Sequence, residues 1–155
     1  MNRIRGFLVT DTEPVNLIVA ACTRELRMIY APRPNLVNVF QSQVHPVRIV
    51  AVDADNMIIG VAEYMGRDSA LYVQGIAVAP KHRRRGVATG LLAHCASLAV
   101  HAGLPALEIA TIKETGNVGI FNRLGFVVID ERVSERFWSH DEQPVTEITL
   151  RRGVA

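Results

Sequence analysis

The sequence has only two cysteines, Cys22 and Cys95, among its 155 residues, and each lies in an apolar segment of helical spacing. So few thiols exclude the class of small secreted domains held together by disulfides, and they predict buried thiols in a reducing compartment. The five histidines are scattered, without cysteine or histidine partners at the spacing of metal ligands. We therefore expect no metal centre.

The sequence also lacks a surplus of charge and a long apolar run. The net charge of +2 and the pI of about 8.8 are too small to indicate a nucleic-acid partner. Near the N-terminus, Asp11, Glu13 and Pro14 interrupt a stretch that otherwise looks like a leader segment, and no other run is long enough to span a membrane. We expect one domain over residues 1–155, located in the cytoplasm and without a membrane partner.

What the sequence does contain is a strand, a basic turn and a helix start in direct succession. Residues 71–79 form an apolar run of strand character, Pro80 ends it, and basic residues follow up to Arg85 before Gly86 opens an apolar-periodic helix. The start of a helix presents backbone N–H groups without partners and a partial positive charge. Because three arginines precede these N–H groups, the segment predicts a site for a phosphate or pyrophosphate.

Residues 83–88, Arg-Arg-Arg-Gly-Val-Ala, resemble the Arg/Gln-x-x-Gly-x-Gly/Ala signature of the GCN5-related N-acetyltransferases. Residues 76–80 are similar to the strand that precedes this signature in the family. Residues 117–126, Asn-Val-Gly-Ile-Phe-Asn-Arg-Leu-Gly-Phe, resemble the family's Asn-Val-x-x-Tyr-x-x-x-Gly-Phe segment. The resemblance implies the acyl-CoA N-acyltransferase fold. This is an α/β (α+β) domain with a mixed, mostly antiparallel sheet of about six to seven strands, a splayed parallel pair and about four helices.

Periodicity and turn residues predict the other elements. In the first half we expect strands over residues 5–10, 47–52 and 57–65, a helix from Asp11 to about Ile29, a break at 31–34 and a weaker helix over 35–44. In the second half we expect a helix over 88–102, a strand over 106–112 parallel to the central one, a short helix ending at Leu124, and strands over 126–133 and 145–151. Residues 134–144 are then either a plain hairpin connection, which we favour, or a substrate-side loop.

The central strand over residues 71–79 is apolar on both faces, which is typical of a strand in the middle of a sheet. Strict alternation predicts the residues of each face. One face would carry Leu71, Val73, Ala77 and Ala79, and the other Tyr72, Ile76 and Val78.

The resemblance also implies acetyl-coenzyme A (acetyl-CoA) as the cofactor. The backbone of Ile76, Ala77 and Val78 would hold the pantetheine arm and the acetyl oxygen, and the loop would hold the pyrophosphate. The implied loop residues are Arg83, Arg84, Arg85, Gly86, Val87, Ala88 and Thr89. Asn117 corresponds to an amide that the family places near the pantetheine, or else it caps the start of the short helix.

Phe121 departs from the family's pattern, because many members have at this place a tyrosine that donates a proton to the departing thiolate. Phenylalanine has no proton to donate. Three consequences are open. Water or another side chain serves as the acid, the thiolate leaves unassisted, or acetyl transfer is slow or lost and the protein only binds coenzyme A.

The general base also remains open. Glu63, on the strand beside the central one, and Glu108, on the neighbouring parallel strand, are the candidates, and each is otherwise an ordinary strand carboxylate. Tyr64 and His140 are further alternatives. Gln74 stands where some relatives have a glutamate, and it cannot take a proton.

These observations predict an acetyl-CoA-dependent N-acetyltransferase that acts on a primary amine of a small molecule or of a protein. A coenzyme A-binding regulatory module with weak or no transfer is the alternative, because of Phe121 and the missing obvious base. Binding of nucleic acid through residues 82–85 is a third hypothesis, which the isolation of this basic run disfavours. The resemblance further implies a homodimer through the C-terminal strands, whereas the acceptor cannot be identified from the sequence.

Overall fold

In the computed structural model, which describes residues 2–34 and 45–154, the chain forms one mixed sheet with helices on both faces. The strands are β1 (Arg3–Gly6), β2 (Tyr30–Pro32), β3 (Val47–Val52), β4 (Ile58–Arg67), β5 (Ala70–Val78), β6 (Ala106–Ile112), β7 (Val127–Ser139) and β8 (Pro144–Gly153). The α-helices are α1 (Thr12–Leu26), α2 (Val87–His101) and α3 (Asn117–Arg123). The sheet order is β1-β3-β4-β5-β6-β8-β7-β2, and within the described strands only β5 and β6 run parallel.

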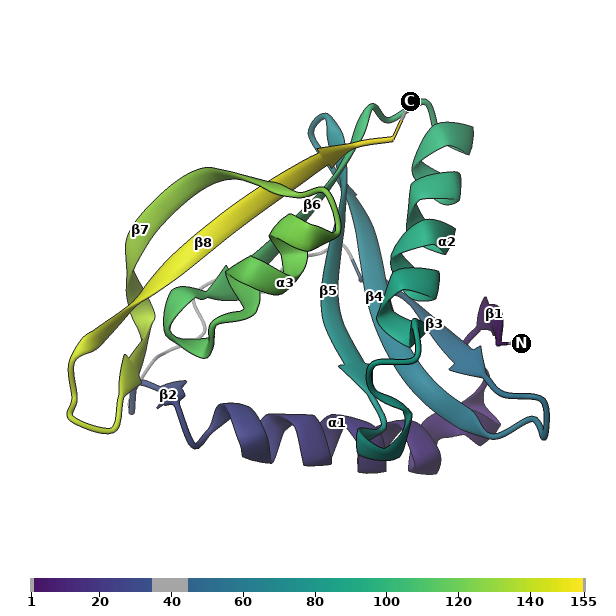
Figure 1. The fold of residues 1–155 in the computed structure, drawn as a ribbon, viewed down its shortest axis with the longest axis horizontal. Helices are drawn as coiled ribbons and strands as arrows, with labels where there is room; N and C mark the ends of the chain where they lie inside the picture. The colour runs from purple at the N-terminus through teal and green to yellow at the C-terminus, as the bar shows by residue number, and fades with distance from the viewer. Residues whose placement is uncertain (1, 35–44, 155) are drawn as a thin grey trace.

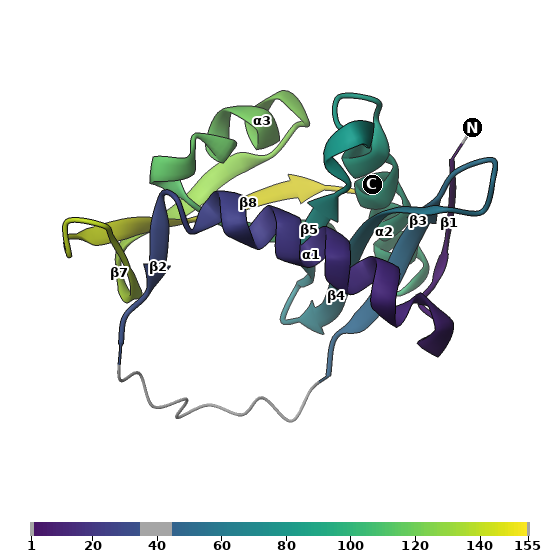
Figure 2. The ribbon, with the colours of Figure 1, turned by 90° about the horizontal axis from the view of Figure 1, so that it is seen from below.

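The helices form two layers, with α2 and α3 on one face of the sheet and α1 on the other (Figures 1 and 2). The alternation along β3 shows how the sequence produces these layers. Ile49 and Ala51 are buried in the cluster that α2 covers, whereas Val50 and Val52 are buried against Val15 of α1. Complete burial of each such valine contributes about 1.5 kcal/mol or more.

The predicted fold class and the elements with strong local signals are confirmed. The bounds of β3 and β6 coincide with the prediction, and β6 is parallel to β5. The helix predicted to open at Gly86 starts at Val87 with Gly86 as its N-cap, and Gly103 follows its end in a left-handed conformation with φ +73°. The described sheet has eight strands instead of six or seven, and three α-helices are described instead of four. The predicted helix over residues 35–44 lies outside the described residues.

The predicted boundaries near the N-terminus are wrong. The first strand covers Arg3–Gly6 instead of residues 5–10, and Val9–Asp11 is a 3₁₀ turn. The carboxylate of Asp11 accepts a hydrogen bond from the backbone N–H of Leu8 at 2.8 Å, which turns the chain before the strand can continue. The helix that follows ends at Leu26 instead of Ile29.

The plain connection predicted for residues 134–144 is also wrong, because most of it is strand. The strand β7 continues to Ser139, and Ser139 donates a backbone hydrogen bond to Gln143 at 2.8 Å across a short turn. The added part of β7 pairs with β2, where Tyr30 lies opposite Ser139. This partner is more than a hundred residues away in the sequence, so no local pattern indicates it.

The two cysteines differ in environment, and the prediction that both are buried holds for one of them. Both are free thiols. Cys95 is fully buried in α2, and burial raises the pKa of its thiol to about 11. Cys22 on α1 is only partly buried. None of the described helices has the length and hydropathy needed to cross a membrane.

A partly buried ion pair fixes the start of α1. Both carboxylate oxygens of Asp11, which is 5% exposed, accept hydrogen bonds from the Arg5 guanidinium, at 2.7 and 3.0 Å. These bonds hold the pKa of Asp11 below its ordinary value. A carboxylate with a lowered pKa in the folded state stabilises the protein above its ordinary pKa, and this contribution is lost as the pH falls through the lowered value.

We expect Asp11→Asn to lower the free energy of unfolding by about 2 kcal/mol at pH 7, because it leaves Arg5 without its partner. The difference from the wild type should narrow as the pH falls from 7 to 3, since protonation then removes the same charge from the wild type. Urea unfolding over this pH range measures both effects. Glu13→Gln, an exposed position two residues away, is the control and should differ little at either pH. A deficit of Asp11→Asn that does not change with pH would contradict the role of the ion pair.

Candidate functional site

The parallel strands β5 and β6 separate after a short paired stretch (Figure 1). Their pairing covers residues 71–73 of β5 and ends at Val73 opposite Ile109. Beyond this point β5 stays paired with β4 as far as Val78, and β6 stays paired with β8 as far as Ile112. The edge of β5 over residues 74–78 therefore has no strand partner on the β6 side in the described chain. Side chains of Cys22 and Arg83 contact the carbonyl of Val78 at its end, and the part before Val78 is where a ligand can reach backbone groups.

A β-bulge lies at the point of separation. Because Glu63 pairs with Gln74 and Val61 pairs with Ala77, the single residue between them on β4 faces two residues of β5. The first of these two is Gly75, with φ +60°, a conformation that a residue with a Cβ adopts only under strain. Bulges redirect backbone and side chains and are frequent next to active sites.

The bulge makes the predicted faces of β5 wrong. Leu71 and Val73 pack in the cluster under α2, but Ala77 packs on the opposite face with α1. Ile76 and Val78 pack on the α2 side, although strict alternation assigned them to the face of Tyr72. The extra residue of the bulge reverses the alternation for the second half of the strand.

The start of α2 lies at the end of β5 and leaves its first backbone N–H groups free. Gly86 is the N-cap residue with φ +78°, and no side chain caps it in the described structure. The first helical bond runs from the N–H of Gly90 to the carbonyl of Gly86 at 2.9 Å. The N–H groups of residues 87–89 therefore have no helical carbonyl partner, which is the arrangement that favours an anion at a helix start.

Close packing holds this helix start against the sheet. Val87, the first residue of α2, is 3% exposed and sits over Gly60 of β4. A Cβ at position 60 would lie 2.7 Å from a methyl group of Val87. Glycine at this position therefore allows the close approach that brings the free N–H groups to the separation of β5 and β6.

The three arginines of the loop do not all face a prospective phosphate. The Arg83 guanidinium turns back to α1, where it binds Glu25 at 2.7 Å. Arg84 and Arg85 are exposed and have no hydrogen-bond acceptor among the described residues. Arg85 and the turn between β3 and β4 line a hollow of about 440 Å³. This turn lies on the side of β5 away from β6.

Of the two predicted carboxylates, Glu63 lies closer to the separation of the strands. It pairs with Gln74, the residue before the bulge, and one of its carboxylate oxygens is 3.4 Å from where a Cβ of Gly75 would be. Its contact with Arg48 is loose, at 3.6 Å. Glu108 instead lies within the paired stretch and binds Arg151 at 2.8 Å.

The other candidate side chains are engaged elsewhere. Tyr64 packs against the cluster on the α2 side, and His140 contacts the carbonyl of Met28 at 2.7 Å. Gly116, not Asn117, is the N-cap of α3. Phe121 lies edge-on to Phe126 with 6.0 Å between ring centroids and packs against the core.

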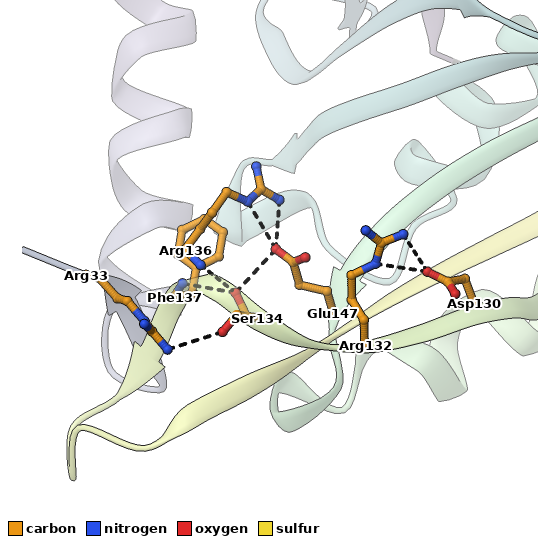
Figure 3. A network of polar contacts seen from close by, with 7 residues as sticks. All are labelled: Arg33, Asp130, Arg132, Ser134, Arg136, Phe137 and Glu147. Atoms are coloured by element: carbon orange, nitrogen blue, oxygen red, sulfur yellow. Dashed lines mark hydrogen bonds and ion pairs between the residues drawn. The ribbon is translucent and has the colours of Figure 1, made fainter. Parts of the chain in front are cut away.

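A network in the β7–β8 hairpin was not predicted (Figure 3). Ser134 is 1% exposed, and its hydroxyl accepts the N–H groups of Arg136 and Phe137 at 3.2 and 3.0 Å, which bends β7. Arg136 then reaches Glu147 across the hairpin at 2.8 Å, while Arg33 approaches the carbonyl of Ser134 from the end of β2. A serine within a strand pattern was the only local signal of this bend.

Comparisons with known proteins agree with this geometry. The model of the acetyltransferase (GNAT) family matches residues 16–126. A search of curated proteins finds no match. In the described part of the chain, no group of three or more histidine, cysteine or acidic side chains could hold a metal ion.

Solved structures similar to the whole chain include three bacterial proteins. The GCN5-related N-acetyltransferase from Kribbella flavida has a TM-score of 0.70 and 22% identity, over 98% of this chain and 97% of its own. A Bacillus anthracis protein assigned as a streptothricin acetyltransferase, solved in complex with acetyl coenzyme A, has a TM-score of 0.71 and 15% identity, over 99% of both chains. The ribosomal-protein-S18-alanine N-acetyltransferase from Escherichia coli has a TM-score of 0.66 and 17% identity, over 100% of this chain and 95% of its own. At these identities the likeness shows the fold alone.

We expect Gly60→Ala to lower the free energy of unfolding by about 2 kcal/mol, because the added methyl group forces Val87 and the start of α2 away from the sheet. Gly90→Ala, in the same helix and with open space around its Cβ position, should instead raise it by about 0.5–1 kcal/mol. Chemical denaturation of the two variants compares them directly. Equal effects of the two substitutions would contradict the close approach at Gly60.

Proposed function

Because the chain belongs to the acetyltransferase (GNAT) family, whose members use acetyl-CoA, we propose that it transfers the acetyl group to a primary amine of a small molecule or of a protein. The observation that carries this proposal is the position of the free N–H groups of α2 beside the separation of β5 and β6. Free N–H groups at a helix start can bind an anion, and the separation of the strands exposes an edge along which an extended chain can bind.

The residues present fit the cofactor. In our proposal the amides of residues 84–89 bind the pyrophosphate, with positive charge from Arg84 and Arg85. The exposed edge of β5 over residues 76–78 binds the pantetheine arm, which is an amide-containing chain and can pair with backbone groups. These contacts use backbone atoms, so the side chains there are free to serve the core, as Ala77 does.

When bound, acetyl-CoA supplies an activated thioester. The chain must then hold the amine beside the bulge and accept the proton that the amine loses. We propose Glu63 for this proton transfer, directly or through one water, because it lies at Gly75 and its ion pair with Arg48 is long. Glu108 is a weaker candidate, since Arg151 and the parallel pairing hold it away from the separation.

Phe121 gives the chain no proton donor at the position where many relatives have tyrosine. Its ring belongs to an aromatic contact with Phe126, so its present role is packing. We propose that the thiolate leaves without a side-chain acid, which a leaving group with a pKa of about 8.5 permits near neutral pH. A coenzyme A-binding module without transfer is the alternative that this residue favours.

Thiol release from acetyl-CoA tests the function against this alternative. The wild type, given acetyl-CoA and a panel of small primary amines and a peptide with a free N-terminus, should release coenzyme A thiol only in the presence of an accepted amine. Glu63→Gln should lower this turnover about 100-fold or more near neutral pH, because loss of general-base help typically costs that much. Glu108→Gln, which also removes one strand carboxylate, should retain most of it.

Two outcomes would contradict these assignments separately. Tight binding of coenzyme A with no amine-dependent release by the wild type would favour the binding module. Normal turnover by Glu63→Gln would remove Glu63 as the base and leave the transferase assignment standing.

A further inference from the structure

Arg83 is the first residue of the loop signature, yet its side chain contacts the protein and not the open face of the loop. Its Nη1 atom donates to Oε2 of Glu25 at 2.7 Å, and its Nη2 atom lies 3.4 Å from the sulfur of Cys22. Its Nε atom donates to the carbonyl of Val78 at 3.4 Å. One guanidinium thus joins the end of β5, the loop and the C-terminal half of α1.

The charges at this contact are complementary at neutral pH. The hydrogen bond from Arg83 lowers the pKa of the Glu25 carboxyl below its ordinary value, so Glu25 is an anion. The same bond raises the pKa of Arg83. The side chain of Glu25 remains 53% exposed and that of Arg83 38% exposed. Water screens such a pair, so it contributes little to the free energy of unfolding. What it does is hold the loop at Arg83 in place relative to α1.

The loop needs an external contact of this kind. Arg84 has φ +61°, a left-handed conformation that is unfavourable for a residue with a Cβ, and Gly86 two residues later has φ +78°. Strained backbone persists only where the surrounding structure holds it in place. Arg83 immediately precedes the strained residue, and its three contacts hold the chain there to β5 and α1.

We infer that Arg83 and Glu25 are positioning residues for the cofactor: their ion pair braces the loop against α1, so that the amides of residues 84–89 point together at the pyrophosphate. The inference rests on the proposed cofactor site and goes beyond it, because it removes the Arg83 side chain from the set of phosphate ligands. It also gives a function to Glu25, which no sequence motif indicated. Arg84 and Arg85 remain the cations for the diphosphate.

The rival interpretation, that Arg83 binds phosphate directly, predicts the opposite result for one substitution. If Glu25 only competes with phosphate for Arg83, then Glu25→Gln frees the guanidinium and coenzyme A binds as tightly as before or more tightly. If the pair is a brace, Glu25→Gln loosens the loop and coenzyme A binds more weakly, even though a negative charge has been removed.

Calorimetric titration with coenzyme A should compare the wild type with Glu25→Gln, Arg83→Gln, the double variant, and Glu13→Gln as control. Glu13 is an exposed carboxylate of the same helix, about 18 Å away along its axis and without a partner among the described residues. We expect Glu25→Gln to raise Kd about two- to fivefold, the size typical of a partly exposed pair. Glu13→Gln should leave Kd unchanged. The loss of binding free energy in the double variant should be smaller than the sum of the losses in Glu25→Gln and Arg83→Gln.

Cys22 provides a second readout that needs no ligand. Its sulfur is covered in part by Arg83, so the ligand-free Glu25→Gln variant, which keeps the arginine but releases its guanidinium, should react faster with iodoacetamide at Cys22 than the wild type and the Glu13→Gln control. Buried Cys95 should stay unreactive in all of them. The melting temperatures should remain close to that of the wild type, which separates a positioning effect from partial unfolding.

The outcomes are distinct. Coenzyme A binding by the wild type with unchanged or tighter binding by Glu25→Gln would overturn the brace and leave the cofactor assignment standing. Weaker binding by Glu25→Gln with faster labelling of Cys22 would establish it, even if Arg83→Gln failed to fold. No binding of coenzyme A by the wild type would overturn the proposed cofactor site, and the brace with it.

Discussion

The early separation of β5 and β6 is the constraint on which the rest of the site depends. In the part of the chain that the structure describes, the pairing of the two strands ends at Val73 and Ile109, so a stretch of the β5 edge has no strand beside it. The bulge at Gly75 turns this stretch, and the absence of a Cβ at Gly60 lets α2 start directly next to it. Free N–H groups at a helix start and an open strand edge thereby lie next to each other, and our proposal assigns the first to the diphosphate and the second to the pantetheine arm of one extended ligand.

Features of the fold and of the site could be predicted from the sequence where they depend on neighbouring residues, and not where they depend on segments far apart in the chain. The bounds of β3, α2 and β6 follow from local periodicity and from stops such as Gly103, and the loop at Gly86 has its own chemistry. The pairing of β2 with β7 joins segments far apart in the sequence, and no local pattern indicates it. The bulge in β5 was missed because one extra residue reverses a face without changing the composition.

The electrostatics of the open sheet face bear on the chemistry. The strand registers place Glu63, Glu108 and Glu147 on the same face, and each has an arginine partner. Two of these pairs are 2.8 Å long, whereas the pair of Glu63 with Arg48 is 3.6 Å. The sequence alone treats these carboxylates as equivalent, and the length of the contact with arginine is what distinguishes Glu63 from the other two.

The most direct test of the account is a titration with coenzyme A followed by backbone amide NMR. In our proposal the ligand binds backbone N–H groups at the start of α2 and along the edge of β5. We therefore expect the largest shift changes at the amides of residues 84–89 and 74–78, with little change in the turn between β3 and β4. Shifts confined to that turn and to the hollow beside Arg85, with the amides of residues 87–89 unaffected, would contradict it.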